Sequence, residues 1–419
     1  MLYEVKTPVQ KIEKYNSQSR ENLISKKQLE EIEKLAQPLR GLKVNLINST
    51  PRGGGVAEIL KGLVPLMKGV GLKAKWYTIP ANEKFFKVTK QIHNALQGKN
   101  DDFPLSDQRI YLEHTKKISQ LMKDMKADVW VIHDPQPLGI IQFLPGLHPS
   151  ICRVHIDLTS PNKKVWDFMS SFLKDYDRVV VSSKKFIKPE IKEKAVIIRP
   201  AIDPLSLKNI PLAPRLAKQI LKRYGISPKK PLISQVSRFD PWKNPLGVVR
   251  AYRIAKKRIP NLQLALVGFF LARDDPEAKG VYNKIRKETF KDKDIFLFTD
   301  LSPLKEVKVQ VFVNAIQTCS TLILQKSIRE GFGLTVSEAM WKEKVVIGGR
   351  AEGIKIQIKN GENGFLVSSP AQTAKRIVEI IQNPKLARKL GKNAKAVIKK
   401  DFLMPRLLRD YLKLFQELS

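Results

Sequence analysis

The chain has 419 residues, of which 42% are hydrophobic and 8% aromatic, so it can bury two ordinary cores and is not composed like a disordered protein. Its two cysteines, Cys152 and Cys319, both lie in apolar runs, which argues against a structural disulfide, and no Cys or His spacing suits a metal site. The polar N-terminus and the lack of an apolar run of about 18 residues predict a cytoplasmic protein without a membrane span.

The formal net charge of +36 raises the question of a polyanionic partner. The lysines are spread along the whole chain, and they alternate with acids in stretches such as QLEEIEKL and PEIKEKA, as on solvated helix faces. No basic stretch is interleaved with aromatic residues, as a groove for single-stranded nucleic acid requires. We therefore expect a lysine-rich surface and no specific nucleic-acid partner; anionic small ligands and incidental binding of polyanions remain open.

Short apolar, β-branched runs alternate with amphipathic stretches twice along the chain, which predicts two doubly wound α/β sheets. In the first half the expected strands are Val44–Ile47, Trp76–Ile79, Val129–Ile132, Cys152–Ile156, Val179–Ser182 and Val196–Ile198. In the second half they are Leu232–Val236, Leu262–Val267, Ile295–Phe298, Leu322–Leu324, Val345–Ile347 and Gly364–Val367.

Three regions follow from this pattern. Residues 1–205 form an expected N-terminal Rossmann-like domain, whose first forty residues read as a helical extension. The proline-containing segment RPAIDPLSLKNIPLAPRL leads into a second Rossmann-like domain, residues 206–400. Residues 401–419 form a C-terminal helix that we expect to pack back on the first domain.

Ligands of doubly wound sheets bind beyond the carboxyl ends of the strands, so the residues after each apolar run are the candidates for a site. Gly53, Gly54 and Gly55 follow the first strand and precede the helix Val56–Met67. Glycines allow close approach of a ligand and the helix N-terminus favours an anion, but a tight turn alone explains them equally well.

A second candidate, Ser237–Asn244, directly follows the first strand of the second domain. Arg238 supplies a planar fork of donors and Lys243 a point charge, the combination that suits a diphosphate. The alternative is that both are ordinary surface cations.

The third candidate is SIREGFGLTVSEA, which follows Leu322–Leu324 and opens a helix. Backbone N–H groups of Phe332, Gly333 and Leu334 are expected to point out of the helix start. Glu330 in the turn can accept hydrogen bonds from sugar hydroxyls, and Glu338 in the helix can reach a ribose.

Together, Arg238, Lys243 and the Glu330…Glu338 element resemble the retaining GT-B glycosyltransferases of family four, in which two Rossmann-like domains face each other across a cleft. The resemblance covers nearly the whole chain. Strings including NSTPRGGGVAEIL, HDPQPLGI, RVHIDLTSPN, QVSRFDPWKN, SIREGFGLTVSEAMW and GIKIQI resemble the trehalose-forming subgroup. This subgroup transfers glucose from a nucleoside-diphosphate glucose to free glucose, reversibly.

The resemblance implies a role for each matching position. Arg238 and Lys243 hold the donor diphosphate as leaving group, Glu330 binds hydroxyls of the transferred glucose, and Glu338 binds the ribose. The remaining implied site residues all lie in the first domain. Gly54 and Gly55 contact the donor, His155 faces the donor sugar, and Asp157, His133 and Asp134 lie on the acceptor side.

The family's favoured mechanism is front-face departure, in which the leaving phosphate takes the acceptor proton, so no cofactor and no obligatory metal is expected. Two positions depart from the family pattern: Glu352-Gly353 stands where a Gly-Gly pair is common, and Lys326 where an apolar residue is usual.

Several alternatives stay open at this point. The acceptor could be fructose, a sugar phosphate, a glucan or a lipid-linked sugar, and the donor UDP-, ADP- or GDP-glucose. A non-catalytic polyanion-binding protein that keeps this fold is the second reading. A homodimer is neither favoured nor excluded.

Overall fold

The computed structural model describes residues 2–17, 22–269, 277–299 and 307–418. These form two compact units. The first contains residues 2–17, 22–201 and 404–418, and the second contains residues 202–269, 277–299 and 307–403. Each unit is an α/β sheet with helices on both faces, as the alternating apolar and amphipathic runs predicted.

The first unit is built on a seven-stranded sheet in the order β1-β3-β2-β4-β5-β6-β7. All its neighbouring strands are parallel except β1, which runs antiparallel to β3. The strands are β1 (Tyr3–Val5), β2 (Lys43–Asn48), β3 (Lys73–Thr78), β4 (Val129–His133), β5 (Ser150–Arg153), β6 (Arg178–Val181) and β7 (Ala195–Ile197).

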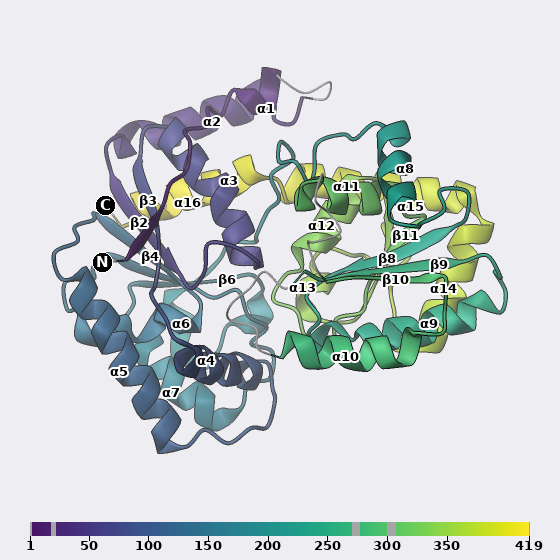
Figure 1. Cartoon of the computed structure of the whole chain (residues 1–419). Helices are drawn as coiled ribbons and strands as arrows, with labels where there is room; N and C mark the ends of the chain where they lie inside the picture. The colour runs from purple at the N-terminus through teal and green to yellow at the C-terminus, as the bar shows by residue number, and fades with distance from the viewer. Residues whose placement is uncertain (1, 18–21, 270–276, 300–306, 419) are drawn as a thin grey trace. The chain divides into compact units, whose positions relative to one another are not determined.

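Helices flank this sheet on both faces (Figure 1). They are α1 (Lys14–Ser17), α2 (Lys26–Ala36), α3 (Gly55–Gly69), α4 (Glu83–Leu96), α5 (Leu105–Met122), α6 (Pro135–Leu138), α7 (Lys163–Leu173) and the last helix of the chain, α16 (Met404–Gln416). The expected helical extension is only partly helical, since the edge strand β1 precedes α1 and α2. A three-residue strand lacks enough alternation to be distinguished from a coil in the sequence.

Helix α16 packs against α2 and α3 of the first unit. Lys413 Nζ lies 2.9 Å from a Glu31 carboxylate oxygen, and Gln416 donates a 2.9 Å hydrogen bond to the carbonyl of Leu35. The apolar face of α16 is buried, including Leu408, Leu412 and Phe415. Burial of this face, rather than the two exposed polar contacts, supplies most of the stabilisation.

The second unit has a six-stranded, fully parallel sheet in the order β10-β9-β8-β11-β12-β13. The strands are β8 (Leu232–Val236), β9 (Gln263–Val267), β10 (Ile295–Phe298), β11 (Leu322–Gln325), β12 (Val345–Gly348) and β13 (Phe365–Leu366). Residues of β8, β9, β11 and β12 are almost wholly buried, which explains their continuous rather than alternating hydrophobicity.

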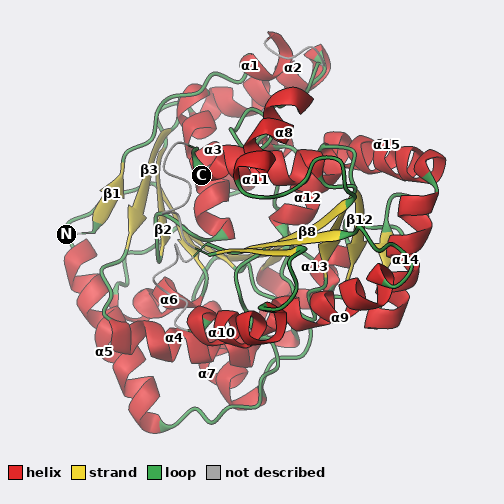
Figure 2. Ribbon diagram, turned by 45° about the vertical axis from the view of Figure 1, so that its right-hand side comes forward, coloured by secondary structure: helices red, strands yellow, loops and turns green. Residues whose placement is uncertain are grey.

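Figure 2 shows the helices that cover the two faces of this second sheet. They are α8 (Pro214–Arg223), α9 (Pro245–Lys256), α10 (Ala278–Thr289), α11 (Val309–Cys319), α12 (Leu334–Trp341), α13 (Glu352–Lys355), α14 (Pro370–Gln382) and α15 (Pro384–Asp401). One core lies between the sheet and α9 and α14, and another lies between it and α8 and α11. Strands β8 and β11 are hydrogen-bonded neighbours, so the segments that follow them emerge at one edge.

Candidate active site

The two candidate segments of the second unit meet beyond the carboxyl ends of β8 and β11. The backbone N–H of Ile328 donates a 2.7 Å hydrogen bond to the carbonyl of Trp242. The buried side chain of Gln235, in β8, accepts from the N–H of Lys326 at 3.0 Å and donates to the carbonyl of Lys243 at 3.0 Å. These bonds hold the segment that carries Lys243 beside the segment that carries Glu330.

A short ion pair joins the two segments. Lys243 Nζ lies 2.6 Å from Glu330 Oε2, and their side chains are only 17% and 10% exposed. The Ser327 hydroxyl donates to the same oxygen at 2.9 Å, and Gln325 Nε2 lies 3.5 Å from it. A mostly buried carboxylate that accepts from this many donors has little rotational freedom, so its orientation is fixed.

Arg238 leaves the same β8 segment and is less buried. Its side chain is 29% exposed, and its guanidinium lies 3.7 Å from a carboxylate oxygen of Asp240. Asp240 is buried and caps the one-turn helix Pro241–Lys243 by accepting from the N–H of Trp242 at 2.9 Å. The sequence prediction that Arg238 and Lys243 stand together after this strand therefore has a structural basis in one capped turn.

The turn before α12 requires its glycines. Gly333 has φ of +85°, and a Cβ there would also lie 3.2 Å from Glu330 Cγ. Gly353 donates its N–H to the Glu330 carbonyl at 3.0 Å, and a Cβ on it would lie 2.5 Å from that oxygen. Among the described residues, no side chain caps the N-terminus of α12. Phe332 buries its ring against Phe402, with ring centroids 5.5 Å apart, while Leu334 opens the helix.

Glu338 lies one turn into α12 and is buried. Lys208 Nζ lies 3.4 Å from Glu338 Oε1, and Gln317 Nε2 lies 3.5 Å from Oε2. Lys342 donates to the Glu338 carbonyl at 3.2 Å, and burial lowers the pKa of Lys342 to about 7, with the Glu338 charge opposing that shift. The expected ribose-binding carboxylate thus has a lysine partner on the segment that follows the first unit.

The two departures from the family pattern lie in different surroundings. Glu352 opens α13 and forms a 2.9 Å ion pair with Lys355, so its charge is balanced locally. Lys326 is 3% exposed, and burial lowers the pKa of its ammonium.

In the first unit, three of the expected site residues, His133, Asp134 and His155, form one cluster at the ends of β4 and β5. His133 Nδ1 lies 3.0 Å from His155 Nε2, and the N–H of His155 donates to Asp134 Oδ1 at 2.7 Å. Asp157 accepts from the N–H of Thr159 at 2.9 Å. Asp134 holds φ of +65°, a backbone conformation that costs free energy in a residue with a Cβ.

The histidine pair is uncharged at neutral pH. Burial, and next the charge of Arg153, lowers the pKa of His133 to about 3. The same two causes, with His133 third, hold the pKa of His155 well below its usual value. Two neutral imidazoles 3.0 Å apart can share one hydrogen bond, whereas two imidazolium ions would repel.

Arg153 was not predicted from the sequence. It ends β5, is 1% exposed, and donates to the Ser182 hydroxyl at 3.2 Å. Within the described part of the chain, Arg153 Nη1 and His133 Nε2 are buried without a hydrogen-bond partner. The sequence did contain a signal for this residue, namely an arginine inside the apolar run ICRVHI. Burying a charged side chain costs free energy, so an arginine in a buried strand is uncommon and indicates a specific role.

The glycine segment precedes α3 with Gly54 as its N-cap, and no described side chain caps this helix. Gly53 needs its φ of +87°, but Gly54 has an ordinary extended φ of −134° and a Cβ on it would meet no described protein atom within 4 Å. Packing within the described part of the protein therefore does not account for a glycine at position 54.

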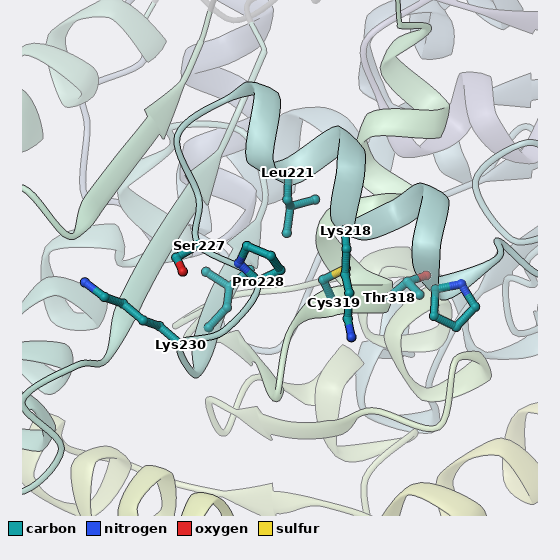
Figure 3. Close-up of a pocket in the computed structure, with 9 residues that line it drawn as sticks. Lys218, Leu221, Ser227, Pro228, Lys230, Thr318 and Cys319 are labelled. Atoms are coloured by element: carbon teal, nitrogen blue, oxygen red, sulfur yellow. The ribbon is translucent and has the colours of Figure 1, made fainter.

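A pocket with a volume of about 170 Å³ lies elsewhere, at the amino ends of β8 and β11 (Figure 3). Its lining comes from α8, the segment before β8 and the end of α11, and includes Lys218, Lys230 and Cys319. None of the predicted site residues lines it.

Among residues 2–17, 22–269, 277–299 and 307–418, no group of three His, Cys, Asp or Glu side chains could hold a metal ion. In the same ranges, no helix has the length and hydropathy of a membrane span.

Comparison with known proteins identifies the family of this chain. Residues 46–188 match the family described as "Trehalose synthase, N-terminal domain", and residues 217–397 match "Glycosyl transferases group 1". The chain is 40% identical over its full length to the whole of a trehalose synthase from Pyrococcus horikoshii.

The chain belongs to the trehalose synthase family. A second trehalose synthase, from Thermococcus litoralis, is 42% identical over 94% of each chain. Among solved structures, one titled trehalose-6-phosphate from E. coli, bound with UDP-2-fluoro glucose, is similar with a TM-score of 0.69 at 13% identity. It covers 89% of this chain and 98% of the other, and it supports the GT-B fold of this trehalose synthase family member.

Proposed function

We propose that the chain is a retaining glycosyltransferase that moves glucose from a nucleoside-diphosphate glucose to free glucose, forming α,α-trehalose reversibly. The observation that carries the proposal is the Lys243–Glu330 ion pair of 2.6 Å, set beside Arg238 and the uncapped start of α12. The full-length similarity to trehalose synthases supports the sugar product.

Arg238 and Lys243 bind the donor diphosphate in this proposal. The leaving group gains negative charge as the bond from the glucose C1 to the phosphate oxygen breaks, and two fixed cations stabilise that charge. The N–H groups at the start of α12 add further donors to the same anion. These cations do the work that a divalent metal does in other transferases, so no metal is required.

Glu330 receives hydroxyl groups of the transferred glucose. The donors on its carboxylate, Lys243 and Ser327, orient it before the sugar arrives, which lowers the entropy cost of productive binding. Glu338 binds the ribose hydroxyls, and the ribose shares this carboxylate with Lys208.

His155, His133, Asp134 and Asp157 bind sugar hydroxyls in the first unit, with His155 directed at the donor sugar. The neutral state of His155 suits a hydroxyl partner, because an uncharged imidazole can accept or donate a hydrogen bond. The acceptor's O1 forms the new bond to C1 on the face that the phosphate leaves, and the acceptor proton passes to the leaving phosphate oxygen. This step retains the anomeric configuration without an enzyme nucleophile.

The test is trehalose formation by the purified protein from glucose with UDP-, ADP- or GDP-glucose. The UDP sugar is tried first, because a solved neighbour of this fold is titled as bound with UDP-2-fluoro glucose. Glu330→Gln should lower kcat/KM by about 100-fold or more, the usual loss for a charged group that acts in the transition state.

Glu362→Gln is the matched control, since Glu362 is a 70% exposed carboxylate of the same unit and should leave turnover unchanged. Donor turnover without trehalose formation would support a glycosyltransferase but contradict glucose as its acceptor. The absence of both turnover and nucleotide binding would contradict the proposal that the protein is an enzyme.

A further inference from the structure

Gln357 lies just beyond α13, within the string GIKIQI, and has no role in the proposed chemistry. Its side chain is 2% exposed. The amide nitrogen Nε2 donates to the carbonyl of Phe332 at 2.6 Å and to the carbonyl of Gly353 at 3.0 Å, with the Gly333 carbonyl at 3.4 Å. The amide oxygen Oε1 accepts from the Ser337 hydroxyl at 2.6 Å. One side chain therefore joins the turn, α12 and α13.

The chemistry of the partners determines the orientation of this amide. Carbonyl oxygens can only accept hydrogen bonds, so the nitrogen must face Phe332 and Gly353. The oxygen then faces Ser337, whose hydroxyl can donate. The backbone of Gln357 is itself held, because its carbonyl accepts from the side-chain amide of the buried Asn363 at 3.1 Å.

Peptide geometry links Gln357 to the donor site. In a planar trans peptide the C=O and the following N–H point in opposite directions. A Phe332 carbonyl held toward Gln357 therefore directs the Gly333 N–H away from Gln357. The weaker contact to the Gly333 carbonyl acts in the same sense on the Leu334 N–H. These are two of the N–H groups that the proposed function assigns to the donor diphosphate.

The two peptide planes are restrained differently. The Gly333 carbonyl also accepts from the Val336 N–H at 3.0 Å, so α12 itself holds the Gly333–Leu334 plane, whereas the Phe332 carbonyl is held by Gln357 at 2.6 Å. Gly333 has φ of +85° and no side chain, and α12 has no capping side chain at its start among the described residues. Glycine leaves the backbone free to rotate, so a carbonyl without a partner could turn and take its N–H with it. A buried donor that satisfies the Phe332 carbonyl removes that freedom.

We propose that Gln357 is a positioning residue that, through the Phe332 carbonyl, orients the Gly333 N–H group toward the donor diphosphate and thereby sets donor affinity. This rests on the proposed function. Gln357 touches no substrate; it acts through the peptide planes of the turn.

The test measures the affinity for UDP, ADP and GDP by calorimetry, and the KM for donor and for glucose, in Gln357→Met and Gln357→Glu. Met keeps the size of the side chain but offers no donor, and Glu places a carboxylate against two carbonyls. Gln357→Met should weaken binding of the preferred nucleotide about tenfold or more, raise the donor KM in proportion and leave the glucose KM unchanged. Gln357→Glu should weaken binding further.

Gln263→Met is the matched control for the loss of a buried amide. Gln263 is 1% exposed in the same unit, and its amide exchanges two hydrogen bonds with the backbone of Ser227, at 3.0 and 2.9 Å. Both Met variants should lower the midpoint of thermal unfolding, but only Gln357→Met should weaken nucleotide binding. If Gln357→Met does not fold, Ser337→Ala removes one bond of the same amide and should raise the donor KM several-fold.

Unchanged nucleotide affinity in a folded Gln357 variant, or an equal loss in Gln263→Met, would reject the positioning role while leaving the proposed function intact. A wild-type protein that binds no nucleoside diphosphate would instead reject the proposed function, and the inference with it.

Discussion

Single residues in this protein act largely through charges held in buried places. Glu330 Oε2 accepts from Lys243 and Ser327 within 2.9 Å, and Arg153 is buried beside two neutral histidines. A charge that is already oriented and desolvated interacts more strongly with a ligand than a solvated one. Burying a charge also lowers the free energy of unfolding unless its partner offsets the cost of removing the charge from water.

The histidine pair leads to a prediction for stability against pH. The native pKa values of His133 and His155 lie below the unfolded value of about 6.5, so the unfolded chain binds more protons as pH falls. The free energy of unfolding is then intact above pH 6.5 and falls below it, by about 1.4 kcal/mol per pH unit for each histidine. Arg153 is the charged group that acts on this pair, and Tyr411, Asp134, Arg406 and Cys152 in turn act on Arg153.

Denaturant unfolding between pH 7 and 5 would measure this slope before most carboxylates titrate. The double variant His133→Asn/His155→Asn should have a flatter dependence than wild type. Parallel curves for the two proteins would contradict the neutral-pair interpretation.

At the scale of elements, the start of α12 depends on backbone conformation more than on side chains. Gly333 supplies a left-handed residue before the helix, and Gly353 allows α13 to approach the turn until its N–H reaches the Glu330 carbonyl. Helix α12 carries Glu338 and Ser337 on its buried side. The helix, the turn and the Glu330 carboxylate are therefore placed by one set of close contacts.

Gly333→Ala should lose about 1–2 kcal/mol of stability from the left-handed conformation and, in addition, most of its activity. The new methyl group would lie 3.2 Å from Glu330 Cγ and displace the carboxylate. Gly361→Ala is the control, because Gly361 has φ of +81° and open space around it. Thermal unfolding and kcat/KM are the two measurements. Equal loss of activity in both variants would show that general strain, and not contact with Glu330, is responsible.

At the scale of the whole molecule, two features do not belong to any one site: the return of the chain to its first unit and its net charge. Gln416 and Leu35 are bonded although they are 381 positions apart. The surface of α2 and α3 that contacts α16 can be buried only after residues 404–416 have been synthesised. This long sequence separation raises the loop-closure cost of folding.

The charge of +36 should attract an anionic donor and leave a neutral acceptor unaffected. We therefore expect the donor KM to rise several-fold between 50 and 500 mM NaCl, because the Debye length falls to about 4 Å at the higher concentration. The glucose KM in the same assays is the internal control. A donor KM independent of salt would show that the surface charge has no part in donor capture.

The alternation of apolar and amphipathic runs was enough to predict twelve strands, since buried parallel strands need continuous hydrophobicity. Arg238, Lys243 and Glu330 each follow a predicted strand, and the carboxyl ends of parallel strands share one edge of a sheet. The sequence thus determined the fold class and the edge at which the candidate residues gather. The roles of the individual residues stay predictions.

Only the tertiary structure decided which side chains meet across long separations. Lys208 reaches Glu338, and Gln357 reaches the carbonyls of the turn, through contacts that have no periodic signal in the sequence. The antiparallel pairing of β1 and the buried guanidinium of Arg153 belong to the same class. Local pattern specifies which surfaces must be buried, whereas the partner of a buried polar group depends on how the elements pack, and that is settled by the fold as a whole.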